Sequence, residues 1–149
     1  MASLCLVAVS EALHSVLNVA AMTALATGGV SDAIEQKRGY PFLMYAVSDS
    51  ARATGLGTKP GQNLSSEVAI RLHVFSKAPG FKAAHAVMKK AIELLSVTDA
   101  LRTSLASGGY TLCGGEPFYD ETVPIGETVI AGEVVQELVA NFRLYVEEA

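Results

Sequence analysis

Residues 67–76 read EVAIRLHVFS, and this segment decides the fold class of the chain. Apolar side chains occupy every second position from Val68 to Val74, with Arg71 and His73 between them. A period of two predicts a β-strand with one buried face. Pro79-Gly80 ends this strand, and residues 81–95 then carry apolar side chains at spacings of three and four, which predicts an amphipathic helix.

The residues before this strand predict its hairpin partner. Residues 40–53 read as a strand entered through Pro41, where the missing N–H is tolerated. Residues 55–63, GLGTKPGQN, are rich in turn formers and predict a long mobile hairpin loop. This loop leads into a strand rather than a helix, and Lys59 is followed by Pro60, so a phosphate-binding loop is not indicated.

The N-terminal part predicts one long helix over residues 3–26. Its apolar positions form one stripe at helical spacing, and Gly28-Gly29 is expected to end it. Residues 30–36 predict a short strand. The polar stripe of the helix is narrow, so we expect the helix to be covered by the sheet and also by a neighbouring subunit.

The C-terminal part predicts a short helix and two further strands. Thr98-Asp99 begins the helix, which ends at Gly108-Gly109, and a strand begins at residues 110–113. Residues 114–132 contain several glycines and prolines and predict a loop, and residues 134–146 predict a long final strand. The whole chain, 1–149, therefore predicts a single α+β domain in which a mostly antiparallel sheet packs against a long N-terminal helix and a central helix.

Composition favours an oligomer. The chain is 50% hydrophobic and only 17% charged, below the roughly 25% that is usual for soluble domains. With so few charged side chains, we expect some apolar surface to be buried against other chains. The apolar N-terminus lacks a basic segment, because the first basic residue is Lys37, and Glu11 and His14 interrupt it. We therefore expect no signal peptide and no membrane segment, and a protein that is cytoplasmic when made.

Charge is distributed unevenly along the chain. The formal net charge is −4, which argues against a protein that grips nucleic acid through bulk electrostatics. Residues 111–149 contain eight acidic residues and one arginine, whereas residues 1–110 carry a small excess of basic residues. Two unlike surfaces of this kind attract in a head-to-tail contact, whereas either surface repels its own copy.

Catalytic and metal-binding patterns are weak, so we predict no catalytic, cofactor or metal site. The three histidines, His14, His73 and His85, lie on separate predicted elements without metal-ligand spacing. Cys5 and Cys113 are far apart and indicate neither a zinc site nor a disulfide framework. A deep pocket containing His73 or Cys113 would instead favour a small soluble ligand-binding protein or enzyme, and that alternative stays open.

The joint arrangement of the segments resembles a known family. The relevant stretches are YPFL at 40–43, the strand at 68–75, the helix AAHAVM at 83–88 that ends in IELL at 92–95, and ANFRLYV at 140–146. In this order the chain resembles the small tail-completion, or tail terminator, proteins of long-tailed phages and phage-like gene transfer agents.

The resemblance implies a structural virion protein without catalytic residues. Such a protein forms a homohexameric ring that ends polymerisation of the tail tube and presents a surface to the head-proximal neck, adaptor or stopper proteins. DNA is expected only in transit through the ring, and assembly is expected in the bacterial cytoplasm. A different neck or tube component of the same particle is the alternative within this class.

Three sets of residues are expected to carry contacts. Arg52 and Lys59, in and beside the hairpin loop, are expected to contact a neighbouring ring, and Ala20 and Ala24 are expected to lie in a subunit interface. The acidic segment at 116–127 is expected to hang away from the sheet as a loop and face the channel lumen or its rim, through Glu116, Asp120, Glu121 and Glu127. A solvated outer loop that keeps the particle soluble is the alternative for this segment.

Overall fold

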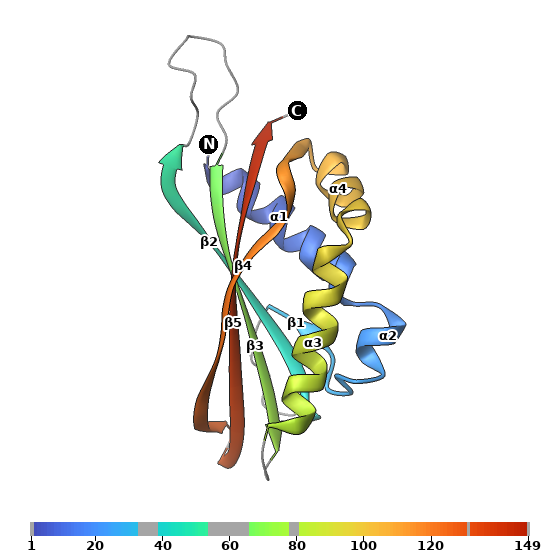
Figure 1. The fold of residues 1–149 in the computed structure, drawn as a ribbon, viewed down its shortest axis with the longest axis vertical. Coiled ribbons are helices and arrows are strands. Elements are labelled where there is room, and N and C mark those ends of the chain that lie inside the picture. Colours follow the sequence, from blue (N-terminus) through green and yellow to red (C-terminus); the bar gives the residue numbers. More distant parts are fainter. Residues whose placement is uncertain (1, 33–38, 54–65, 78–80, 131, 149) are drawn as a thin grey trace.

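The computed structural model describes residues 2–32, 39–53, 66–77, 81–130 and 132–148, and it has helices on one face of a twisted sheet (Figure 1). The predicted hairpin loop at 55–63 lies outside the described residues. The helices are α1 (Ala2–Leu17), α2 (Ala20–Thr23), α3 (Lys82–Ser96) and α4 (Thr98–Ser107). The strands are β1 (Val30–Ser31), β2 (Phe42–Ala53), β3 (Ser66–Lys77), β4 (Tyr110–Ile130) and β5 (Glu133–Glu148).

The sheet has the strand order β1-β2-β3-β5-β4. The two-residue strand β1 pairs parallel to β2, and every other pairing is antiparallel. Leu72 of β3 lies opposite Tyr45 of β2 on one side and Ala140 of β5 on the other. The α+β class with a mostly antiparallel sheet is therefore confirmed, and the last strand in the chain lies inside the sheet rather than at its edge.

The main core lies between the sheet and α1, α3 and α4. Alternate positions of β3 and β5 point inward, and the inward side chains are almost fully buried. Helix α1 contributes a buried stripe at spacings of three and four, as its sequence predicts. The side chains of α1, β3 and β5 in this core are Cys5, Ala8, Val9, Ala12, Leu13, Val16, Leu17, Val68, Ile70, Leu72, Val74, Leu138, Ala140, Phe142, Leu144 and Val146.

The N-terminal helix is shorter than predicted, because it ends at Leu17 and not at Gly28-Gly29. Val19 adopts an extended conformation (φ −117°, ψ 161°), and the short helix α2 follows it. In one continuous helix Met22 would lie about 140° around the axis from Leu17. The break turns Met22 into the core, where it is fully buried, while Ala20 and Ala24 are exposed.

The segment at 114–132 is not a loop, and this part of the prediction is wrong. Residues 110–130 form the single strand β4, which pairs with β5 through three irregularities of register. Gly114 and Gly126 have φ values of 88° and 105° and lie at two of these bulges. Because β4 is at the edge of the sheet, Pro117 and Pro124 need no backbone N–H for a further partner strand.

The opposite face of the sheet has a smaller apolar cluster at the end where β4 turns into β5. Phe42, Phe75, Ile130 and Val135 are buried there, with Tyr40 and Met44 packed against them. The rings of Phe42 and Phe75 stack with centroids 4.8 Å apart. We call this face, which the described helices leave uncovered, the outer face.

Candidate interaction surfaces

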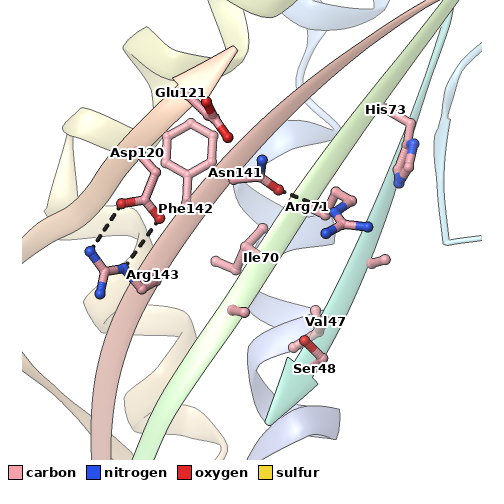
Figure 2. A pocket seen from close by; sticks show the side chains of 12 residues that line it. Val47, Ser48, Ile70, Arg71, His73, Asp120, Glu121, Asn141, Phe142 and Arg143 are labelled. Carbon is pink, nitrogen blue, oxygen red and sulfur yellow. Dashed lines mark hydrogen bonds and ion pairs between the residues drawn. The ribbon is translucent and has the colours of Figure 1, made fainter. Parts of the chain in front are cut away.

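The outer face of the sheet contains a shallow hollow of about 750 Å³ (Figure 2). Side chains from four adjacent strands line it, because alternate residues of each strand point away from the helices. Polar groups converge there on apolar strand surface. The lining includes Ser48 of β2, Arg71 and His73 of β3, Asp120 and Glu121 of β4, and Asn141 and Arg143 of β5.

Arg143 joins three strands across this hollow. Its Nε and Nη2 atoms donate hydrogen bonds of 3.2 and 3.0 Å to the two carboxylate oxygens of Asp120 on β4. Its Nη1 atom lies 4.0 Å from Glu67 on β3, and its guanidinium lies 5.0 Å from the ring centre of Phe118. The hydrogen bonds and charge of Asp120 raise the pKa of Arg143, so this group stays cationic.

Further cross-strand pairs follow along the outer face. Arg71 Nε donates a hydrogen bond of 3.1 Å to Oδ1 of Asn141, which lies directly opposite in the register. His73 Nδ1 lies 2.8 Å from Oε1 of Glu137, and both side chains are largely buried. The basic side chains of this face therefore have acidic or amide partners on neighbouring strands, which favours a structural surface over a reaction centre.

The alternative of a small enzyme depended on a deep pocket around His73 or Cys113. His73 does line the hollow, but the hollow lies on the open face of the sheet, and Cys113 is not part of its lining. Within the described residues no group of three or more His, Cys, Asp and Glu side chains is arranged to hold a metal ion. Nor does any helix of the described part have the length and apolar character needed to cross a membrane.

The four acids expected at the lumen or rim all lie on β4. Glu116, Asp120, Glu121 and Glu127 are exposed. Glu121 and Glu127 pair with Asn141 and Gln136 of β5, while Glu116 and Asp120 lie in irregularities of the same strand, so none of the four is carried on a loop that hangs away from the sheet. Asp120 differs from the others because its charge is balanced by Arg143.

The residues expected at other contacts lie elsewhere. Ala20 begins α2 and Ala24 follows it, and both are exposed rather than part of the core. Lys59 and the side chain of Arg52 lie outside the described residues. Of these four residues the structure places Ala20 and Ala24, which lie on and directly after α2 rather than on β4.

Sequence reasoning missed an apolar surface on β4 and the start of β5. Phe118, Ile125, Val129 and Val134 are between 50% and 68% exposed. Val129 lies directly opposite Val134 in the β4–β5 register, so the two side chains share a face of the hairpin. The available signal was the recurrence of Ile125, Glu127 and Val129 at every second position, but the neighbouring prolines and glycines favoured the prediction of a loop.

Comparisons with solved structures and with protein families show what the chain is similar to. The fold matches a chain of a solved structure titled "Virion of native gene transfer agent (GTA) particle". The match has a TM-score of 0.62 and 15% sequence identity, and it covers 93% of each chain, which shows a shared fold. No curated protein matches the sequence.

The model of the family "Tail completion protein gp17" matches residues 11–116, more than half of the chain and including α3, α4 and the first three strands. The chain therefore belongs to the tail completion protein gp17 family, a family of structural phage tail proteins.

Proposed function

We propose that this protein is a tail terminator: a homohexameric ring that ends polymerisation of the tail tube and forms the surface on which the head is joined. The observation that carries the proposal is the family match over residues 11–116. It is supported by the fold shared with a chain of a virion over nearly the full length of both. The partners are other copies of the chain, the tail tube protein below the ring and the neck, adaptor or stopper proteins above it.

The surface of the subunit supports assembly with other chains. Large apolar side chains are exposed on α1, after α2, between α3 and α4, and along β4. An edge strand with exposed apolar residues associates readily with other chains unless it is covered in the assembly. Ala20 and Ala24, both exposed, are proposed to lie in the subunit interface, and Arg52 and Lys59 are proposed to contact the neighbouring ring.

The acids of β4 are proposed to face the channel lumen or its rim. DNA carries one negative charge per roughly 1.7 Å of its axis, so a lumen lined with lysine and arginine would retain it during passage. Glu116, Glu121 and Glu127 instead present negative charge, and the Asp120–Arg143 pair is locally neutral. Replacing Glu116, Asp120 and Glu121 with Lys should leave particles assembled and slow the delivery of DNA. Delivery at the normal rate would contradict a lumen position.

The ring itself is tested by imaging particles assembled in the cells that produce them. Without this protein we expect tubes of uncontrolled length and heads without tails. With it, classification by symmetry should show one sixfold ring between the tube and the head. Particles that join heads to tails of normal length without the protein would overturn the proposal. Stacked rings of this chain along the tail would make it a tube component instead.

A further inference from the structure

Some exposed charged side chains of the described residues have a partner on a neighbouring strand, and others have none. On the outer face, Arg71, His73, Lys77 and Arg143 have acidic or amide partners on a neighbouring strand. On α3, Lys82 and Lys89 are exposed, and on β4 Glu127 is exposed, and the described part of the chain supplies an ion-pair partner to none of these three. Charges of opposite sign therefore remain uncompensated on two different elements.

The first surface is the hairpin arm, defined as Ile125, Glu127 and Val129 of β4 with Val134 of β5. Its three apolar side chains are 55%, 68% and 50% exposed. Glu127 and Val129 lie opposite Gln136 and Val134, so these side chains share one face of the hairpin. An acidic residue is thus set within a small apolar surface at the end of two paired strands.

The second surface is the basic helix face, defined as Lys82, His85, Ala86 and Lys89 of α3. Spacings of three and four place these residues on one side of the helix, and all four are exposed. The opposite side of α3 packs into the core through Ala84, Val87, Met88 and Ala91. The lysine stems and Ala86 offer apolar contact, and the lysine heads offer positive charge.

Within one subunit these two surfaces do not pair with each other. Figure 1 shows the β4–β5 hairpin and the start of α3 at the same end of the molecule, with β3 between them in this view. Val129 and Val134 nevertheless remain exposed, and among the described residues no ion pair joins Glu127 to Lys82 or Lys89. A second subunit that is rotated about a common axis presents one surface to the other.

We propose that the hairpin arm of one subunit packs against the basic helix face of the next copy of this chain, and that this head-to-tail contact closes the ring. The inference rests on the ring of the proposed function and assigns its contact surfaces. Arm against arm would bring two copies of Glu127 together, so a contact of the arm with itself is disfavoured by charge. When the contact joins two different surfaces, each subunit offers its hairpin arm to one neighbour and its basic helix face to the other, as a closed ring requires.

The assignment places Glu127 at a boundary between two subunits. Among the four acids proposed for the lumen or rim, Glu127 is then the rim residue, while Glu116, Asp120 and Glu121 lie nearer the channel. Ala20 and Ala24 belong to the receiving side of the subunit, because α2 is in contact with α3.

A charge exchange tests the contact in particles. The single change Glu127→Lys and the double change Lys82→Glu with Lys89→Glu should each lower the yield of joined particles by about tenfold or more, because like charges then meet. All three changes together should restore the yield to within about twofold of the original, because opposite charges again face each other. Arg102→Glu, an exposed change on α4 outside the surface, is the matched control and should have no effect. Failure of the triple variant to recover, with all variants folded by circular dichroism, would overturn the inference.

Disulfide cross-linking tests the same contact without changing any charge, so it does not depend on how well the charge variants assemble. Val129→Cys combined with Ala86→Cys should give disulfide-linked oligomers in oxidised, assembled particles, and Val97→Cys with Ala86→Cys should not. Val97 is a fair control, because it is 60% exposed against 68% for Val129. A sixfold ring without Val129–Ala86 linkage would overturn the contact and leave the proposed function standing. Absence of any ring in the particle would overturn the proposed function itself.

Discussion

Arg143 of β5 holds Asp120 of β4 through two hydrogen bonds across the bulge between Tyr119 and Glu121. A planar guanidinium can bind both carboxylate oxygens at once, which fixes the geometry of the pair. An acidic segment that the sequence suggested as a projecting loop is in this way tied to the adjacent strand. The pair links β4 to β5 at a position where the register of the two strands shifts.

Asp120→Asn should therefore loosen β4 locally rather than unfold the protein. Both side chains are partly exposed, so solvent screens the pair and its contribution to global stability is small. Hydrogen exchange of the β4 amides near residues 118–122 should become faster, and 1 M salt should reproduce part of the change in the original protein. Unchanged exchange in this segment would show that strand pairing alone holds the bulge.

Leu13→Ala should be strongly destabilising, because Leu13 of α1 is fully buried against the sheet. Removing a buried leucine side chain leaves a cavity, and the expected loss is about 2–5 kcal/mol of unfolding free energy. Val7→Ala on the same helix is the control, since Val7 is 58% exposed, and it should change stability by less than about 0.5 kcal/mol. Denaturant titration followed by circular dichroism measures both. Equal losses would mean that α1 is covered on both sides.

Gly28→Ala should cost more than Gly109→Ala. A Cβ atom at Gly28 would lie 1.8 Å from the carbonyl oxygen of Gly39, and the Gly28 amide also donates a hydrogen bond of 2.9 Å to Pro41. Because both neighbours are backbone, relief needs a shift of the chain, at about 3 kcal/mol. At Gly109 space is open, and only the positive φ of 86° is strained, at about 1 kcal/mol. Thermal unfolding of the two variants gives the order, and the reverse order would contradict the close approach.

Tyr45 should titrate at higher pH than an exposed tyrosine. Burial raises the pKa of its hydroxyl above the ordinary value of 10.0, a hydrogen bond with Ser10 opposes this, and the charge of Asp32 adds to it. The neutral form is favoured in the folded state, so its contribution to stability is complete below pH 10 and is lost as pH rises through the higher folded pKa. In an ultraviolet titration, Tyr45→Phe should remove the part of the tyrosinate absorbance that appears at the highest pH. Loss of an early component would contradict the prediction.

The strands with strict periodicity were predictable from the sequence. Apolar residues alternate without interruption from Val68 to Val74 in β3 and from Leu138 to Val146 in β5, and α3 follows helical spacing, because each element has one face on the core. The extent of β4 was not predictable, since glycines at bulges and prolines at an edge look like loop residues when the partner strand is unknown. The end of α1 at Leu17 was missed for a similar reason, because the need to bury Met22 is a tertiary requirement.

The candidate surfaces were predictable in composition and not in arrangement. The sequence indicated an acid-rich C-terminal part, and Glu116, Asp120, Glu121 and Glu127 of this part are exposed. It could not pair Arg143 with Asp120 or His73 with Glu137, because these pairs depend on the register of strands, and the paired residues are 23 and 64 positions apart. Nor could it distinguish the compensated cations of the outer face from Lys82 and Lys89 on α3.

The place of β5 between β3 and β4 also determines when a subunit is able to assemble. Within the described sheet, strand β4 pairs with β5 alone, and β5 supplies five side chains of the main core. Until β5 has paired with β3, the chain has neither a complete sheet nor a hairpin between β4 and β5. The exposed apolar side chains of the β4 edge therefore take up their positions only after the core has formed, which makes association at that edge a consequence of folding.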